Sequence, residues 1–272
     1  MPEDDRKDAT RDAVGREIEA AMNEQVSGLP PSLSDAQREK IRLRVREEIE
    51  RDLRARTASD RRDAAHLAKE ARKWNPSVTI IPTPVDTDRH FRRTPHTDRR
   101  PMVIGWVGSH STAPYLRLLD GVLARVAAEH DVVLRVIAGD YEHATCRIEV
   151  RPFDLRSEPS EVADFDIGVL PELDDPWTRG KGAFKAMLYM AAGVPVVASR
   201  VGVNSAVIPD NVVGFCVDTE DDWFAALTSL LTDAPLRQRL GTAGRERAER
   251  EYALRVRAPQ LAEVLRSAGQ RR

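Results

Sequence analysis

The sequence of 272 residues is poor in cysteine and in aromatic residues, and it has no long apolar run. Its two cysteines, Cys146 and Cys216, lie far apart without neighbouring ligand pairs, which argues against a disulfide scaffold or a zinc site. No uncharged stretch approaches the roughly 20 residues that span a bilayer, and residues 1–15 lack the apolar core of a signal peptide. We therefore expect a cytoplasmic protein without a transmembrane segment, in peripheral contact with the inner membrane face at most.

An excess of charge of one sign is also lacking, because 42 basic residues are balanced by 44 acidic ones. Such a chain has no overall attraction to nucleic acid or to an anionic membrane, so any recognition of an anion must be local. The histidines share no spacing with carboxylates or cysteines, and the glycines form neither a P-loop nor a dinucleotide fingerprint. We therefore expect no nucleic-acid partner, no metal and no bound cofactor.

The residues that are present divide the chain into a region over 1–75 and a region over 76–272. The first region is rich in charges of both signs, and we expect it to be helical. Within its segment 34–56, apolar residues at every fourth position form one narrow stripe, made of Ile41, Val45, Ile49 and Leu53. This helix is either a solvated helix that lies on the main domain or pairs with its own copy, or a functional arm.

The second region alternates short β-branched runs with helical patterns. The runs are VTIIP (78–82), MVIGWVG (102–108), VVLRVIAG (132–139), RIEVRPF (147–153), FDIGVLP (165–171), VPVVAS (194–199) and GFCVD (214–218). Helices are expected over 113–129, 157–164, 183–192, 220–232 and 235–251. Consecutive apolar residues are typical of parallel strands covered on both faces. The pattern predicts a single Rossmann-like, doubly wound α/β domain of about six strands, with ligands beyond the strands' carboxyl ends.

Small polar residues follow the run that ends at Gly108. Ser109, Ser111 and Thr112 stand between this strand and a helix with Pro114 near its first turn. Backbone N–H groups and hydroxyl groups at the start of a helix suit a phosphate. The alternative is that Ser111 or Thr112 only caps the helix.

A second loop, in WTRGKGAFKAMLYMAAGVPVVAS at 177–199, brings three cations to the front of an apolar helix. They are Arg179, Lys181 and Lys185. Because the N–H groups leave that end of a helix partly positive, each cation there costs about a few tenths of a kcal/mol unless an anion sits among them. Gly180 and Gly182 let a ligand approach the backbone, and a bound diphosphate would satisfy N–H groups and cations together. The alternative is that the cations point into water or pair with the acidic residues of segment 171–177.

A third feature is the sequence VGVNSAVIPDNVVGF at 201–215. Gly202 fits a turn after a strand, and Asn204 or Ser205 is suited to cap a short helix that follows it. Such a helix would aim its N–H groups at the same ligand. A turn without any binding role explains the segment equally well.

Together these segments resemble the carboxyl-terminal, nucleotide-sugar-binding half of the family 4 retaining glycosyltransferases of GT-B fold. The resemblance runs from about residue 64 to about residue 266. It includes NPSVTIIPTPVDTDRHF, IGWVGSHSTAPYL, DFDIGVLPELDDPWTRGKGAFKAMLYMAAGVPVVASRVGVN, NVVGF and LLTDAPLRQRLGTAGRERAEREYAL. Each segment alone is a weak signal, but their common order is specific.

The resemblance implies a UDP- or GDP-sugar donor, transfer of the sugar to an acceptor such as a cell envelope polysaccharide, and no obligatory metal. It places the donor phosphates near Gly108, Ser109, Thr112, Arg179, Lys181, Gly182 and Lys185. Family members also carry two glutamates eight residues apart, and the matching positions here are Gly180 and Leu188. The second glutamate normally holds the ribose, and a leucine accepts no hydrogen bond from its hydroxyls.

The resemblance further implies an acceptor-binding half upstream of NPSVTIIP, whereas this chain has 75 or so residues there, of which DAAHLAKEARKW resembles that half's last helix. Three hypotheses follow. The chain is a donor-binding component that needs a separate acceptor-binding subunit, a degenerate domain that binds nucleotide weakly or serves as a scaffold, or a complete enzyme that uses its helical arm as a lid. Stabilisation by UDP or GDP that Lys181→Ala removes would favour the first over the second.

Overall fold

The computed structural model describes residues 65–90 and 100–270, together with Ile41 and Leu43, which are helical. The chain divides into two units, residues 1–59 and residues 60–272, and the fold given below is that of the second unit. Apart from Ile41 and Leu43, the predicted helix over 34–56 lies outside the described residues, and so do its packing on the main domain and its pairing with a second copy.

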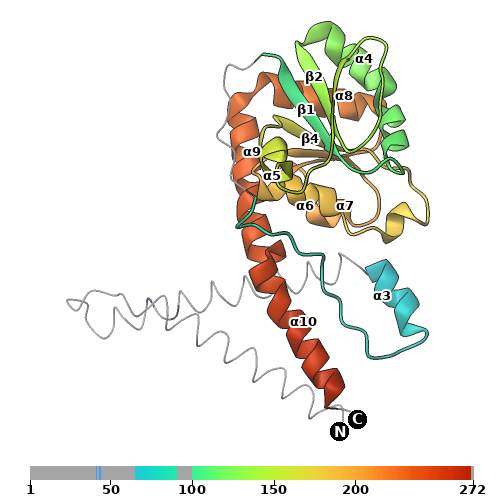
Figure 1. Cartoon of the computed structure of the whole chain (residues 1–272), viewed down its shortest axis with the longest axis vertical. Helices are drawn as coiled ribbons and strands as arrows, with labels where there is room; N and C mark the ends of the chain where they lie inside the picture. The colour runs from blue at the N-terminus through green and yellow to red at the C-terminus, as the bar shows by residue number, and fades with distance from the viewer. Residues whose placement is uncertain (1–40, 42, 44–64, 91–99, 271–272) are drawn as a thin grey trace, which may run out of the picture. The chain divides into compact units, whose positions relative to one another are not determined.

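Six short parallel strands form one sheet at the centre of this unit (Figure 1). They are β1 (Met102–Val107), β2 (Val132–Ile137), β3 (Arg147–Arg151), β4 (Ile167–Leu170), β5 (Val196–Ser199) and β6 (Gly214–Val217). Their order across the sheet is β3-β2-β1-β4-β5-β6, which confirms the predicted doubly wound arrangement. The order reverses between β1 and β4, whose pairing joins Ile104 to Ile167 and Gly105 to Gly168. The carboxyl ends beyond these pairs border the crevice in which ligands of such sheets bind.

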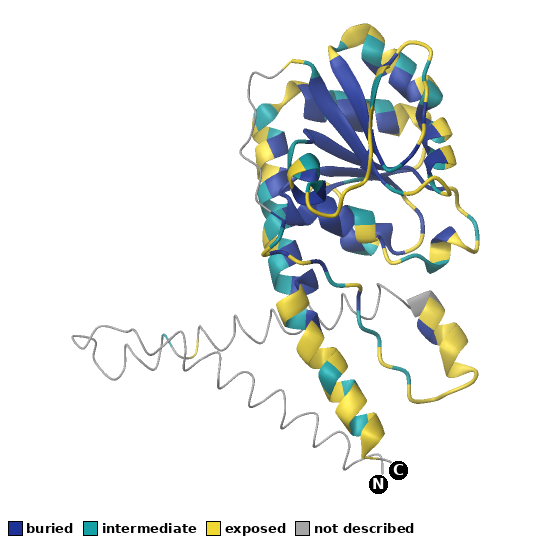
Figure 2. Cartoon of the chain, in the orientation of Figure 1, coloured by how far each residue is buried: buried dark blue, intermediate teal, exposed yellow. Residues whose placement is uncertain are grey.

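Helices cover both faces of the sheet, and β1, β2, β4 and β5 are buried between them, whereas the edge strand β3 is partly exposed (Figure 2). The helices are α3 (Ala65–Arg72), η1 (Ala113–Leu119), α4 (Asp120–Glu129), α5 (Glu158–Ala163), η2 (Thr178–Gly180), α6 (Phe184–Ala191), α7 (Asn204–Val207), α8 (Glu220–Thr232), α9 (Ala234–Arg247), η3 (Ala248–Tyr252) and α10 (Leu254–Gly269). Side chains of β1 alternate between the faces, with Trp106 in the core under η1, α4 and α8 and Val107 in the core under α5, α6 and η3. The helix predicted over 113–129 is divided into η1 and α4, and the one predicted over 235–251 continues as the π-helix η3.

The predicted strand over 78–82 is wrong, because this segment forms no strand in the structure. Pro82 has no N–H group to donate to a ladder, so the segment is unsuited to a central strand. It is tied to the domain further on, where the N–H of Val85 donates to the carbonyl of Tyr252 at 2.8 Å. The segment before β1 is therefore attached to the domain at the end of η3, through Val85.

The described part of the chain shows neither a membrane span nor a metal cluster. None of its helices is long and apolar enough to cross a bilayer. Within the same residues, no group of three or more His, Cys, Asp or Glu side chains is placed to hold a metal ion. Both cysteines are buried as free thiols, and burial raises the pKa of Cys146 and of Cys216.

Candidate functional site

The loop after β1 gathers three hydroxyl groups at the start of η1. The hydroxyl oxygens of Ser109 and Ser111 lie 2.8 Å apart, and the N–H of Ser109 donates to Oγ1 of Thr112 at 3.2 Å. Thr112 occupies the N-cap position but its side chain makes no cap hydrogen bond, so the capping alternative does not describe its role. A Cβ on Gly108 would lie 2.2 Å from the Trp106 indole, so this close approach requires glycine. The predicted residues Gly108, Ser109 and Thr112 therefore lie together at the carboxyl end of β1.

Lys185, in the first turn of α6, joins this loop from the other side of the crevice. Its Nζ donates to Oγ1 of Thr112 at 3.1 Å and lies 4.4 Å from the centre of the Trp106 ring. At the N-cap of α6, Ala183 has left-handed backbone angles with φ 53°, and it makes no side-chain cap. The first N–H groups of a helix have no intrahelical partner, so α6 presents donors beside the Lys185 ammonium. The structure thus brings Lys185 together with the predicted loop.

Burial is the main influence on the charge of Lys185. Burial lowers the pKa of Lys185 from 10.5 to about 8. The negative charge of Glu172 raises this pKa, and the positive charge of Lys181 lowers it further. Among the described residues, no carboxylate lies within ion-pairing distance of Lys185. A bound anion would therefore stabilise the ammonium form and raise this pKa.

Lys181 is paired with a buried carboxylate. Its Nζ lies 3.4 Å from Oε1 of Glu172 and 4.6 Å from the centre of the Tyr115 ring. Glu172 follows β4; its N–H donates to Oγ of Ser199 at 2.9 Å, and its Oε2 accepts from Nδ2 of Asn204 at 3.1 Å. Asn204 therefore holds Glu172, and the predicted cap by its side chain is wrong because α7 has no side-chain cap.

Arg179 makes different contacts. Its guanidinium donates to both carboxylate oxygens of Asp174, at 2.6 and 2.8 Å, and both side chains are exposed. Hydrogen bonding from Arg179 lowers the pKa of Asp174. The alternative that the cations pair with acids of segment 171–177 thus describes Arg179, and it describes Lys181 through its contact with Glu172.

Three other positions that the sequence singled out lie against neighbouring residues. A Cβ on Gly182 would lie 3.1 Å from Oγ1 of Thr83, and one on Gly180 would lie 3.5 Å from the Leu67 side chain. Both glycines therefore border the segment that precedes β1. Leu188 is 3% exposed and belongs to the core under α6, so no acceptor for a ribose hydroxyl stands at this position.

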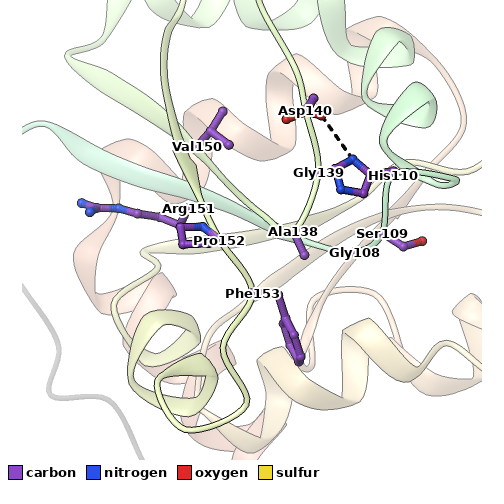
Figure 3. A pocket seen from close by; sticks show the side chains of 10 residues that line it. All are labelled: Gly108, Ser109, His110, Ala138, Gly139, Asp140, Val150, Arg151, Pro152 and Phe153. Atoms are coloured by element: carbon purple, nitrogen blue, oxygen red, sulfur yellow. Dashed lines mark ion pairs between the residues drawn. The ribbon is translucent and has the colours of Figure 1, made fainter.

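A cavity of about 760 Å³ opens beyond the ends of β1, β2 and β3 (Figure 3). It is lined by Gly108, Ser109, His110, Ala138, Gly139, Asp140, Val150, Arg151, Pro152 and Phe153. On its exposed side, Nδ1 of His110 lies 3.2 Å from Oδ2 of Asp140, and Phe153 is 51% exposed. A Cβ on Gly139 would lie 2.8 Å from the Trp106 indole. Trp106 therefore lies under both the cavity and Lys185.

The sequence did not single out Trp106 or the cavity residues that follow β2 and β3, and it offered Glu172 only as one of the acids of segment 171–177 that could pair with the cations. A signal for the cavity is present, because Ala138 and Pro152 lie at the carboxyl ends of two predicted runs, and ligands of such sheets bind there. The sequence does not specify which of the acids pairs with Lys181. The pairing of Glu172 depends on η2 and α7 bringing Lys181 and Asn204 beside β4, which no local pattern specifies.

Residues 101–233 match the family model described as glycosyl transferases group 1. This segment is therefore similar to the group 1 glycosyltransferases. The matched residues include the loop after β1, the residues that line the cavity, and the segment from Glu172 to Lys185.

Comparisons with individual proteins agree with this assignment. A stretch of 65 residues, 23% of this chain, is 45% identical to 15% of the D-inositol 3-phosphate glycosyltransferase of Corynebacterium diphtheriae. The sucrose-phosphate synthase of Thermosynechococcus elongatus aligns with 89% of this chain and 65% of its own, at 17% identity and a TM-score of 0.63. HepE of Anabaena, solved with UDP-glucose, aligns over 70% of this chain and 57% of its own, at 15% identity and a TM-score of 0.57.

Structural likeness at these identities concerns the fold. The domain shares the fold of the matched part of these two proteins, as the resemblance in the sequence predicts. This chain spans less than two thirds of the length of each of the three proteins, with shares of 15%, 65% and 57%.

Proposed function

We propose that this domain binds a nucleotide-diphosphate sugar, with UDP or GDP as the nucleotide, and donates the sugar to an acceptor. The position of Lys185 carries the proposal, since a half-buried ammonium without a carboxylate partner in the described chain lies beside a cavity at the end of β1. A cation next to the free N–H groups of a helix is suited to a phosphate. The shared fold of HepE, which was solved with UDP-glucose, supports the choice of ligand.

The candidate groups follow one another along the edge of the sheet. The cavity lies at the ends of β1 to β3, Thr112 and Lys185 lie at the end of β1, and Lys181 and Glu172 lie after β4. We infer that the base occupies the cavity beside Phe153 and that the diphosphate reaches Lys185 and the start of α6. The sugar then extends toward Glu172.

In the proposed transfer, the bond between sugar and diphosphate breaks, and negative charge collects on the leaving diphosphate. Lys185 and the first N–H groups of α6 stabilise that charge more as it grows, which is what accelerates a reaction. We propose that the sugar keeps its anomeric configuration, as in the family that the sequence resembles. No metal is needed for this role of Lys185.

An acceptor-binding domain or subunit completes the proposed enzyme. Trp177 is 75% exposed and Phe184 is 44% exposed, so the segment around η2 and the start of α6 presents apolar surface beside the site. Exposed apolar surface next to a binding site commonly marks a contact with another molecule. A second wall there would orient the acceptor and exclude water.

A second candidate function is a non-catalytic nucleotide-binding or scaffold domain. Leu188 favours it, because a buried leucine cannot replace the glutamate that holds ribose in the family the sequence resembles. Such a domain would bind nucleotide weakly and transfer no sugar.

Thermal unfolding of the full chain with millimolar UDP, GDP or ADP tests the donor proposal. We expect one diphosphate to raise Tm by about 5 °C, the effect of a ligand at roughly 100 times its Kd. Lys185→Met removes the charge but keeps a long apolar side chain, and it should abolish the shift. Lys69→Met, on the exposed side of α3, is the matched control and should keep it. A wild-type Tm that no diphosphate changes would overturn the proposal.

A further inference from the structure

We propose that Glu172 determines which group of a nucleotide lies beyond the second phosphate. Its carboxylate accepts hydrogen bonds from the hydroxyls of a neutral sugar and repels a third phosphate. This inference rests on the proposed donor function, and it specifies the ligand as a nucleoside diphosphate with a neutral, hydroxylated group attached.

Glu172 is held rigidly at the carboxyl end of β4. The residue is 9% exposed, and its N–H donates to Oγ of Ser199 at 2.9 Å. Asn204, itself 1% exposed, donates from Nδ2 to Oε2 of Glu172 at 3.1 Å and to the Ser199 carbonyl at 2.9 Å. These contacts prevent the carboxylate from swinging away when a ligand enters.

The remaining oxygen of Glu172 faces Lys181. Oε1 lies 3.4 Å from Nζ of Lys181, longer than the roughly 2.8 Å of a charge-assisted hydrogen bond. A carboxylate oxygen has lone pairs to spare at such a contact and accepts hydroxyl donors readily. A sugar hydroxyl next to Oε1 and Lys181 therefore finds an acceptor and a donor side by side.

The local charges disfavour an additional phosphate at this place. Arg179 is paired with Asp174, and Lys181 is paired with Glu172. Lys185 is the cation of this segment that has no carboxylate within ion-pairing distance in the described chain. In the proposed complex, Lys185 neutralises the diphosphate. A third phosphate would lie beside the buried Glu172 carboxylate, with no further cation of this segment to neutralise it.

Calorimetric titration of the full chain without divalent cations tests this inference. The probes are UDP, UTP and UDP-glucose, with GDP, GTP and GDP-mannose as the second set. For wild type we expect the triphosphate to bind about tenfold or more weakly than the diphosphate. In Glu172→Gln this penalty should fall to about twofold or less, while the sugar nucleotide weakens about fivefold relative to the diphosphate.

Two further variants make the outcome specific. Glu172→Asp keeps the negative charge, so triphosphates should still bind more weakly than diphosphates. This variant can still be measured if Glu172→Gln does not fold. Glu263→Gln removes an exposed charge on α10 and should change neither ratio. A purely structural role for Glu172 would weaken all three ligands together.

The possible failures are distinguishable. If wild type binds none of the six probes, the proposed function fails and this inference fails with it. If wild type binds a diphosphate but Glu172→Gln leaves both affinity ratios unchanged, the donor site stands and the role of Glu172 is overturned.

Discussion

Lys185 is the residue on which the proposed site depends. Its ammonium is half-buried over Trp106 and donates a hydrogen bond to Thr112, and partial desolvation there lowers the pKa of Lys185. Keeping a desolvated cation in place costs stability in the empty protein. A bound phosphate would offset this cost, because the phosphate and the ammonium would each take the place of water around the other.

If the proposed site binds a nucleotide, we expect that binding to depend on pH through the pKa of Lys185. An anion raises this pKa above about 8, so between the two values the complex holds more protons than the free protein. Affinity for UDP or GDP should be nearly level around pH 7 and fall by up to about tenfold per pH unit above pH 8. Titration calorimetry between pH 7 and pH 9 measures the slope.

A matched variant isolates the contribution of Lys185 to that slope. Lys185→Arg stays charged over the whole range, so its binding should depend little on pH. Equal pH dependence in wild type and Lys185→Arg would show that another group is responsible.

The sequence predicted those candidate site residues whose place is set by the end of a strand or the start of a helix. Gly108, Ser109, Thr112 and Lys185 each come directly after a strand or at a helix start, and the structure brings them together. The pairing of Glu172 with Lys181 depends on contacts between segments that approach only in the folded domain.

At the element scale, α6 connects the site to the sheet. Lys185 and Tyr189 are four residues apart and so share one face of the helix. The Tyr189 hydroxyl is fully buried; it accepts the N–H of Val107 at 3.1 Å and donates to the carbonyl of Val169 at 3.3 Å. Tyr189 thus bonds to β1 and β4 past their last paired residues, where the strand order reverses.

Removing this hydroxyl should weaken the domain. Tyr189→Phe leaves a buried N–H and a buried carbonyl without their partner, and we expect it to lower the free energy of unfolding by about 1–3 kcal/mol. Urea titration followed by circular dichroism measures the change.

The control for this variant is Tyr115→Phe, which also removes one hydroxyl and keeps the ring near Lys181. The structure gives that hydroxyl no hydrogen bond within the described chain, so we expect a change of less than about 0.5 kcal/mol. Equal losses in the two variants would mean that the contacts of Tyr189 with the strands are not what stabilises the domain.

Element positions were largely predictable because buried parallel strands have a simple pattern. Five of the predicted helical regions and six of the seven runs correspond to elements of the structure. The division of 113–129 into η1 and α4 was not predictable, since a 3-10 turn and an α-helix bury nearly the same apolar positions.

At the scale of the whole molecule, strand order explains how distant segments make one site. Because β1 and β4 are neighbours, the loop at 108–112 and the start of α6 meet across the point where the order reverses. The cavity continues this site toward β3, and Glu172 with Asn204 continues it toward β5. An extended ligand fits this order of groups, with its base in the cavity, its charged middle at Lys185 and its neutral polar end near Glu172.

The most direct test of the donor site is a crystal structure of the full chain with the diphosphate that gives the largest thermal shift. We predict the diphosphate at about 3 Å from Nζ of Lys185 and from the first N–H groups of α6, with the base in the cavity beside Phe153. A nucleotide bound elsewhere, with Lys185 still donating to Thr112 and the cavity empty, would contradict the proposed function.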